Sequence, residues 1–152
     1  MVEFTPATRA DAIELARNLR EADRVELWAA GRDDPLDAIL AGIGGPGWAL
    51  TARRNGVLAL IFGVAPAGSI LDPRGVPWML GTPLVSAHAR VFMRLSAPYI
   101  ARMLREYPHL LNAVHAPNKQ AVGWLRHMGF VLQPAVPMGP RGELFHLFEK
   151  RA

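Results

Sequence analysis

The side chains best suited to metal binding or nucleophilic catalysis are scattered along this sequence. None of its histidines follows the His-Glu-x-x-His or His-x₃-His spacing that places two imidazoles on one metal ion. The histidines stand at positions 88, 109, 115, 127 and 146. The absence of cysteine excludes a thiol nucleophile, a cysteine-bound zinc and a disulfide scaffold. Neither a Gly-x-Ser-x-Gly elbow nor a Gly-x₄-Gly-Lys phosphate loop occurs. The sequence therefore predicts no metal site.

Charge is distributed unevenly along the chain. Residues 1–37 carry nine acids and five arginines, a net charge of −4, whereas residues 38–152 carry four acids and twelve bases, a net charge of +8. A basic main body favours anionic partners such as nucleic acid, phosphate or an acidic protein surface. Nonspecific contact with nucleic acid is therefore considered, although no aromatic interleaving or known binding module accompanies the arginines.

Length and composition indicate one folded domain over residues 1–152. The chain is 51% hydrophobic and 20% charged, which excludes a disordered protein. No apolar run approaches the roughly 20 residues that a membrane helix needs. The first residues lack the basic and apolar regions of a signal peptide, so we expect an intracellular protein without a membrane span.

Hydrophobic periodicity and turn residues place these chemical groups on a mixed set of elements. The predicted strands cover residues 2–5, 48–52, 57–64, 76–85, 110–116, 130–132 and 144–149. The predicted helices cover 8–29, 33–43, 87–107 and 119–128. The order is β-α-α-β-β-β-α-β-α-β-β, which predicts an α/β fold.

Local signals refine several of these elements. Asn55-Gly56 between two apolar runs predicts a hairpin. The unbroken apolar run 57–64 predicts a central strand buried on both faces. Pro98 predicts a kink in the helix 87–107, or a fresh start capped by Ser96. The Pro/Gly-rich segment 134–142 is expected to be a loop.

Three aromatic side chains, Trp78, Trp124 and Phe130, are expected to pack in the core. Aromatic residues at strand or helix spacing are more often core than part of a ligand cage.

One constellation carries a family resemblance. Asn118-x-x-Ala121 opens a short helix, and Gly129-Phe130 opens the strand that follows it. This pattern resembles the acetyltransferases of the GNAT superfamily, and the element order resembles their fold over nearly the whole chain. The resemblance implies a GNAT-like mixed central sheet with helices on both faces. It also implies that strands 76–85 and 110–116 splay apart, leaving a cleft at the N-terminus of helix 87–107.

Two longer sequence segments resemble a particular branch of that superfamily. Residues 76–82 (Val-Pro-Trp-Met-Leu-Gly-Thr) and the Asn112–Phe130 stretch look like the small GNAT-like internal virion proteins of tailed bacteriophages. This resemblance implies partners among phage structural or assembly proteins. It implies a location in the host cytoplasm or the phage virion.

The resemblance makes acetyl-CoA a possible cofactor. GNAT enzymes close glycine amides on the pyrophosphate in a Gln/Arg-x-x-Gly-x-Gly/Ala loop, whereas residues 82–90 of this chain contain no glycine. Weak or absent acetyl-CoA binding is therefore expected. The candidate cofactor-binding residues are Thr82, Leu84, Val85, Ser86, His88, Arg90, Arg94 and Asn118.

The proton-transfer groups also depart from the family pattern. The resemblance places Leu125 where many GNAT enzymes have a tyrosine that protonates the departing thiolate, and leucine cannot donate a proton. Residues 76–85 hold no ionisable side chain. The nearest candidates for a catalytic base are Glu26 and Asp72.

These observations leave two functions open. The first is a phage-type GNAT-like protein with a degenerate acetyl-CoA site, acting in the virion or its assembly through protein contacts. The expected contact surfaces are the acidic region 1–37, the basic region 38–152 and the loop 134–142, which contains Met138. The alternative is an acetyl-CoA-dependent N-acyltransferase with an atypical phosphate-binding loop. The sequence leaves the enzymatic activity, acceptor and oligomeric state open.

Overall fold

The structure is a computed structural model that describes residues 1–69 and 71–152. Its strands are β1 (Val2–Pro6), β2 (Trp48–Arg54), β3 (Val57–Pro66), β4 (Arg74–Gly81), β5 (His109–His115), β6 (Val131–Leu132), β7 (Val136–Met138) and β8 (Glu143–Arg151). Its helices are α1 (Arg9–Arg17), α2 (Glu21–Ala29), α3 (Pro35–Gly44), α4 (Pro83–Ala87), α5 (Ala89–Glu106) and α6 (Lys119–His127). No helix in the described part of the chain is long and apolar enough to span a membrane.

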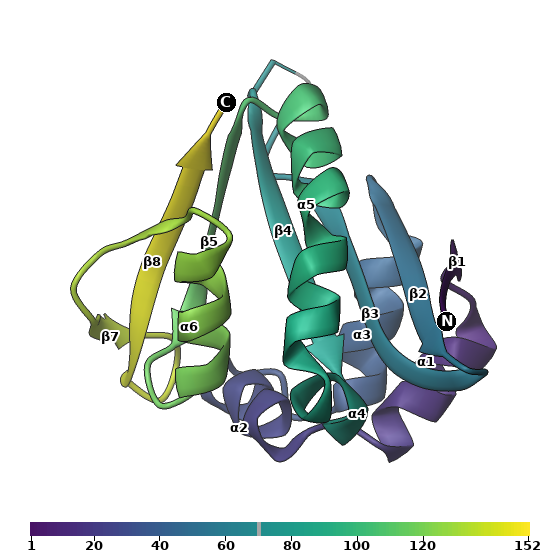
Figure 1. The fold of residues 1–152 in the computed structure, drawn as a ribbon. Helices are drawn as coiled ribbons and strands as arrows, with labels where there is room; N and C mark the ends of the chain where they lie inside the picture. Colours follow the sequence, from purple (N-terminus) through teal and green to yellow (C-terminus); the bar gives the residue numbers. More distant parts are fainter. Residues whose placement is uncertain (70) are drawn as a thin grey trace.

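One sheet organises the molecule. Its strands lie in the order β1-β2-β3-β4-β5-β8-β6, and β7 pairs with β8. Helices α1 and α3 pack on one face of the sheet, while α4, α5 and α6 pack on the other (Figure 1). Strand β3 is central and mostly buried, as the apolar run predicted. The predicted α/β class, with helices on both faces, is confirmed.

Local chemistry explains the element boundaries. Thr8 and Asp11 form a capping box that starts α1, and Asp34 caps α3 ahead of Pro35. The β2–β3 hairpin turns at Asn55-Gly56, where both residues have positive φ, as the sequence predicted.

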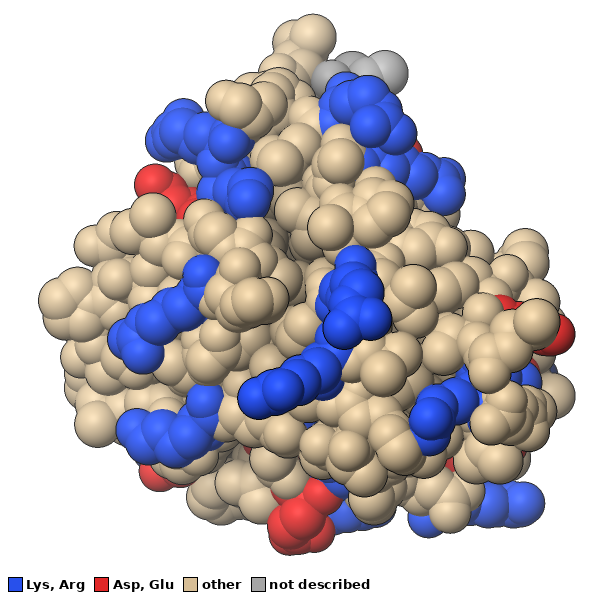
Figure 2. All heavy atoms as spheres, in the orientation of Figure 1, with Lys and Arg blue, Asp and Glu red and all other residues tan. Residues whose placement is uncertain are grey.

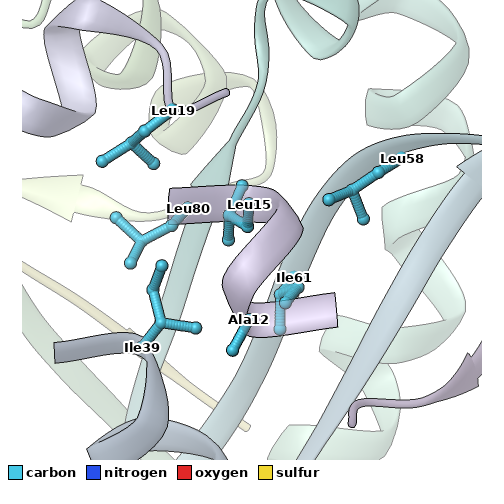
Figure 3. Close-up of a cluster of buried hydrophobic side chains, with 7 residues drawn as sticks. All are labelled: Ala12, Leu15, Leu19, Ile39, Leu58, Ile61 and Leu80. Carbon is cyan, nitrogen blue, oxygen red and sulfur yellow. The ribbon is translucent and has the colours of Figure 1, made fainter. Parts of the chain in front are cut away.

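The core consists of clusters on the two faces of the sheet. On the α1/α3 face, apolar side chains from these helices meet those of β3 and β4 (Figure 3). On the other face, α5 and α6 pack over β5 and β8. Trp124 and Phe130 are buried, as predicted. Trp78 is only half-buried at the edge of the first cluster.

Trp124 is expected to contribute strongly to stability. It is 7% exposed, packs in the cluster formed by α4, α5 and β3, and borders a cavity. Because one side of the ring faces existing space, Trp124→Ala should cost about 3 kcal/mol, the lower end for such truncations. Denaturant melting measures this cost. A loss below about 1 kcal/mol would mean that the ring adds little to the packing.

The first helical region differs from the prediction. A single helix was expected to run from residue 8 to 29, but the chain breaks after Asn18 and resumes at Glu21. Arg20 is not helical at this break, and its backbone N–H donates to the Gly81 carbonyl at 2.8 Å. The break lets α2 turn toward the ends of β4 and β5, which a continuous helix would not reach.

The expected strand 76–85 is too long by four residues. Strand β4 ends at Gly81, and the short helix α4 begins at Pro83 with Thr82 as its N-cap. Pro83 favours the first turn of a helix, and the Thr82 hydroxyl accepts the Leu84 N–H. Thr82, Leu84 and Val85 therefore belong to a capped helix.

The break expected near Pro98 lies ten residues earlier. Helix α5 runs through Pro98 without interruption, and Ser96 does not cap it, because its hydroxyl donates to the Met93 carbonyl. The helical path is instead interrupted at His88, between α4 and α5. Buried Phe92 and Met103 on either side of the proline hold α5 on the sheet and offset the one lost hydrogen bond.

The segment 134–142 is only partly a loop. Its residues 136–138 form β7, which pairs with the start of β8. The Arg141 guanidinium then stacks on Trp28 and donates to its carbonyl at 2.7 Å. Much of this segment is therefore used within the chain. Its predicted role as a contact for other proteins stays a prediction.

Candidate functional site

The site begins where two neighbouring strands separate. Parallel strands β4 and β5 pair only at Arg74–Gly75 with His109–Leu110, and they diverge beyond that point. The predicted splay is confirmed. In Figure 1 the two strands lie close at one end, and α2 lies across the open end. A sheet interrupted in this way leaves backbone groups on both strands without a strand partner.

The direction of each backbone group in β4 follows from its pairing with β3. In an antiparallel pair, alternate residues bond to the neighbour and the others face away. The Thr82 N–H donates to the Ala59 carbonyl, and the Ala67 N–H donates to the Arg74 carbonyl, both at 2.9 Å. Even-numbered residues of β4 therefore bond to β3, and odd-numbered ones face the gap toward β5.

Most of the backbone groups that face the gap already have hydrogen-bond partners. The Pro77 carbonyl accepts from Asn112 Nδ2 at 2.8 Å, and proline has no N–H to satisfy. At the open end, the Gly81 N–H donates to Asp23 Oδ2 at 2.8 Å, and the Gly81 carbonyl accepts the Arg20 N–H.

Met79, between these two positions, is the exception. In the described residues, neither its N–H nor its carbonyl has a partner on the gap side. Met79 lines a cavity of about 590 Å³ that extends through the splay. A backbone donor and an acceptor thus remain available to a ligand.

Helix α2 anchors the two diverging strands through carboxylates one turn apart. The Asp23 carboxylate accepts the backbone N–H of Gly81 in β4, and Glu26 Oε1 accepts the backbone N–H of His115 in β5 at 2.7 Å. Asp23 is paired with the buried guanidinium of Arg20, at 2.7 Å from Nη2. Glu26 has no such partner within the described part of the chain.

Burial sets the ionisation of Glu26. Loss of hydration raises the pKa of its carboxyl from 4.5 to about 7, and the nearby Asp23 charge adds to this effect. The His115 N–H opposes the shift. Glu26 lines the cavity, and its Oε2 has no hydrogen-bond partner among the described residues. A carboxylate with this pKa can accept a proton near neutral pH.

The other candidate base has a different environment. Asp72 lies in the loop before β4, at the end where β4 and β5 still pair. Hydrogen bonds from the Arg74 side chain and backbone lower the pKa of its carboxyl to about 2. At neutral pH this group is a weak base, and it does not lie among the described residues that line the cavity.

Asn118 fits a ligand site. It is 3% exposed, lines the cavity and caps α6, because its Oδ1 accepts the Ala121 N–H. Its Nδ2 has no hydrogen-bond partner in residues 1–69 and 71–152. Although Nδ2 lowers the pKa of Glu26, it does not reach hydrogen-bonding distance. A buried donor without a partner is costly, so a bound acceptor would relieve it.

The other candidate cofactor residues lie around α4 and the start of α5. Val85 is buried in the core, and the Thr82 hydroxyl donates to the Leu58 carbonyl, so neither lines the cavity. Leu84 is half-buried, and Ser86 Oγ accepts from Arg20. The cleft implied by the resemblance was expected to be lined by Thr82, Leu84, Val85, Ser86 and Asn118. Of these, the structure places only Asn118 on the cavity wall.

The basic candidates lie at the start of α5. His88 lies between α4 and α5, where Arg54 Nη1 donates to its Nε2 at 2.7 Å. Arg90 and Arg94 are exposed on α5. The N–H groups of Ala89 and Arg90 have no partner in the described residues, as is usual for a first helical turn.

Leu125 lines the cavity from α6, where it offers no proton. Tyr99 lines the same cavity from α5 and contacts the rings of Phe4 and Phe62. Sequence reasoning missed Tyr99, because the resemblance directed the search for a proton donor to the helix 119–128. It also missed the free groups of Met79, which belong to the backbone and carry no side-chain signal.

Comparison with known proteins finds similar folds among solved structures. No family model matches the chain, and no curated protein matches it either. Among solved structures, a GNAT-family acetyltransferase from Streptococcus pneumoniae is 16% identical and superposes with a TM-score of 0.66, covering 100% of both chains. A protein from Salmonella typhimurium, determined with its cofactor acetyl-CoA, is 14% identical with a TM-score of 0.75, covering 99% of this chain and 94% of its own.

A third structure similar to this chain is spermidine N-acetyltransferase from Vibrio cholerae in complex with CoA and spermine. It is 13% identical with a TM-score of 0.71, covering 99% of this chain and 95% of its own. Nothing in these comparisons bears on a phage particle. The chain has the fold of the GNAT acetyltransferases.

Proposed function

We propose that the chain is an acetyl-CoA-dependent N-acyltransferase, the alternative that the sequence left open. The observation that carries this proposal is the gap between β4 and β5, where the free N–H and carbonyl of Met79 share a cavity with Glu26. A backbone donor and a carboxylate with a pKa of about 7 are the groups that acyl transfer to an amine requires.

The residues of the cavity fit the acyl end of such a cofactor. Met79 would hold it by backbone hydrogen bonds, and Asn118 Nδ2 would donate to an acceptor along it. Between α5 and α6 the wall is apolar, which suits an extended chain with few charges. It is formed by Met93, Ile100, Ala121, Leu125 and Met128.

The charged end of the cofactor calls for a basic surface. Helices α5 and α6 carry six basic side chains and one acid, Glu106. The basic residues are Arg90, Arg94, Arg102, Arg105, Lys119 and Arg126. Figure 2 shows this face with many blue and few red groups. We place the phosphates near the free N–H groups of Ala89 and Arg90, where a first helical turn can stand in for the missing glycines.

The mechanism follows from the residues in the gap. Acetyl-CoA, when bound, supplies an acyl group activated as a thioester. Glu26 takes a proton from the acceptor ammonium, which frees the nitrogen lone pair to form the new C–N bond as the C–S bond breaks. The nitrogen then releases a second proton to solvent, which leaves a neutral amide. The Met79 N–H donates to the acyl oxygen as negative charge develops there. The leaving sulfur keeps the electron pair of the broken bond and receives a proton from solvent or from the Tyr99 phenol.

Calorimetric titration with acetyl-CoA tests the proposal. A dissociation constant of about 10 μM or tighter, about −7 kcal/mol, supports it. Arg90→Ala/Arg94→Ala should weaken this binding, whereas a change at Arg9, on α1, should not. Failure to bind acetyl-CoA would contradict the proposed N-acyltransferase activity and would favour the alternative role in virion assembly. That role would require the protein to be present in purified phage particles or their precursors.

Met79→Pro tests the backbone donor. Proline removes the N–H that faces the gap and keeps the β3–β4 ladder, because Met79 does not donate to β3. Pro77 already occupies an equivalent position of β4. We expect kcat to fall about 100-fold or more, the usual loss for one such donor.

Met79→Leu is the matched control, because it changes the side chain and keeps the N–H. It should retain most of the activity. Equal losses in the two variants, or a Met79→Pro protein with normal turnover, would contradict the assigned role.

A further inference from the structure

One part of the cavity, called the compartment from here on, has a mostly apolar wall. It continues through the splay to the face of the sheet that carries α2 and α3. Its wall there is formed by Leu27, Ala30, Ala38, Ala41, Gly42 and Trp78. Because the proposed acyl site lies between α5 and α6, this compartment is the space left for the acceptor.

Few charges face this compartment. Asp23 lines it, but its carboxylate is already paired with Arg20 and bonded to Gly81. Among the described residues that line the cavity, Glu26 is therefore the single carboxylate free to receive an ammonium group. Arg32 lines the cavity just beyond the end of α2.

The Arg32 guanidinium is available to a ligand. Its nearest acid is Asp37, at 3.9 Å, and its side chain is 45% exposed. Among the described residues it makes no side-chain hydrogen bond. A guanidinium in this state suits a carboxylate, which it can bind through two parallel hydrogen bonds.

We infer that the acceptor is a small amine with one nitrogen cation, an apolar or aromatic body and a carboxylate, as in a hydrophobic amino acid. The ammonium group lies at Glu26, the body lies against Trp78 and α3, and the carboxylate binds Arg32 at the mouth. This inference rests on the proposed function and adds its substrate class. In the reaction, the nitrogen gains the acyl group and loses two protons, one to Glu26 and one to solvent. The sulfur leaves with the electron pair of the broken bond and takes up a proton.

The low number of free carboxylates in the compartment disfavours polycationic acceptors. A polyamine or an aminoglycoside would bring several ammonium groups to a compartment with one free carboxylate. Each further cation would be buried without a partner, which costs several kcal/mol. The Vibrio cholerae neighbour was determined with spermine, so this chain should differ from it in acceptor.

Trp78 and Gly42 set the room for the apolar body. A Cβ at position 42 would lie 2.9 Å from Trp78 Cζ2, so a larger residue there pushes the indole into the compartment. Gly42→Ala should therefore reduce kcat/KM for phenylalanine more than for alanine.

The test compares three amines in a CoA-release assay, after acetyl-CoA binding has been measured by calorimetry. Phenylalanine carries all three features, phenethylamine lacks the carboxylate, and spermidine is polycationic. We expect phenylalanine to have the highest kcat/KM, with a KM near the usual range of up to ~1 mM. Calorimetry without cofactor should detect binding of phenylalanine and none of spermidine.

Arg32→Gln provides the decisive variant. The KM for phenylalanine should rise about tenfold or more, while the KM for phenethylamine stays unchanged, because only the first amine uses the guanidinium. Arg24→Gln is the matched control. That arginine lies on α2, is 44% exposed like Arg32 and is 3.9 Å from Glu21, but it does not line the cavity.

The outcomes separate this inference from the proposed function. Acetyl-CoA binding together with a preference for spermidine, or with no turnover of phenylalanine, overturns the inference and leaves the transferase standing. An equal effect of Arg32→Gln on phenylalanine and phenethylamine also overturns it. Absence of acetyl-CoA binding overturns the proposed function itself.

Discussion

Glu26→Gln should lower kcat about 100-fold or more and remove the pH dependence of turnover near neutrality. The carboxylate is the only described group lining the cavity that combines a pKa of about 7 with a free oxygen. In the wild-type protein, kcat should rise with pH through about 7 as this group ionises and becomes a base. General bases contribute typically 10²–10⁴-fold, and glutamine cannot accept the proton.

Glu26→Gln should raise the stability of the folded protein at neutral pH, although it lowers kcat. The pKa of Glu26 is about 7 in the folded protein and 4.5 as its ordinary value, so the folded state binds the extra proton between these limits. The contribution of Glu26 to wild-type stability should therefore be greatest below pH 4.5 and be lost as pH rises through 7, by at most about 3 kcal/mol. Glutamine keeps the oxygen that accepts the His115 N–H and cannot ionise. Glu26→Gln should therefore remove this loss.

Two measurements check the prediction. Steady-state rates from pH 5.5 to 8.5 test the base, and urea melting at pH 5 and pH 8 tests the buried charge. Glu21→Gln is the control, because Glu21 lies on the same helix with a side chain that is 82% exposed. A variant that keeps wild-type turnover, or a wild-type rate that does not change across pH 7, would remove Glu26 from the mechanism.

Much of the fold follows from local sequence signals. The Asn55-Gly56 hairpin, the buried run of β3 and the Asn118-to-Gly129 helix each depend on residues close together in the chain. The errors arose where distant contacts decide. Helix α1 ends before Arg20 because that residue bonds to Gly81, and no pattern near Arg20 indicates a partner 61 positions away.

The site could be predicted only in part for the same reason. Asn118 and Glu26 were named from the sequence, and both line the cavity. Thr82 and Val85 were named because residues 82–90 stand where the resemblance implies a pyrophosphate loop, but the Thr82 hydroxyl bonds to the Leu58 carbonyl and Val85 is buried in the core. The free groups of Met79 depend on the separation of two strands, which is a property of the whole sheet.

The buried pair of Arg20 and Asp23 should be among the most sensitive positions in the chain. Arg20 is 4% exposed and Asp23 2% exposed, and Arg20 Nε and Nη2 donate to the two carboxylate oxygens at 3.1 and 2.7 Å. Asp23→Ala leaves a buried guanidinium without its counter-charge and the Gly81 N–H without its acceptor. Loss of a partner in a buried pair costs 3–5 kcal/mol, so with the orphaned amide we expect about 5 kcal/mol.

A second pair on the same helix provides the control. Glu21 and Arg24 have the same three-residue spacing, lie 3.9 Å apart and are exposed, so Glu21→Ala should cost less than about 1 kcal/mol. The contrast between the two pairs isolates burial as the cause.

A double substitution shows whether the unpaired charge is responsible. In Arg20→Met/Asp23→Ala no buried cation remains, and the methionine can pack against Trp124, over which Arg20 now lies at 4.8 Å. The double variant should therefore be more stable than Asp23→Ala alone, a strong coupling in a double-mutant cycle. Additive costs would mean that the two side chains act independently. Because Asp23 fixes α2 to β4 and Glu26 fixes it to β5, recovery of stability without recovery of acetyl transfer would assign Asp23 to the positioning of Glu26.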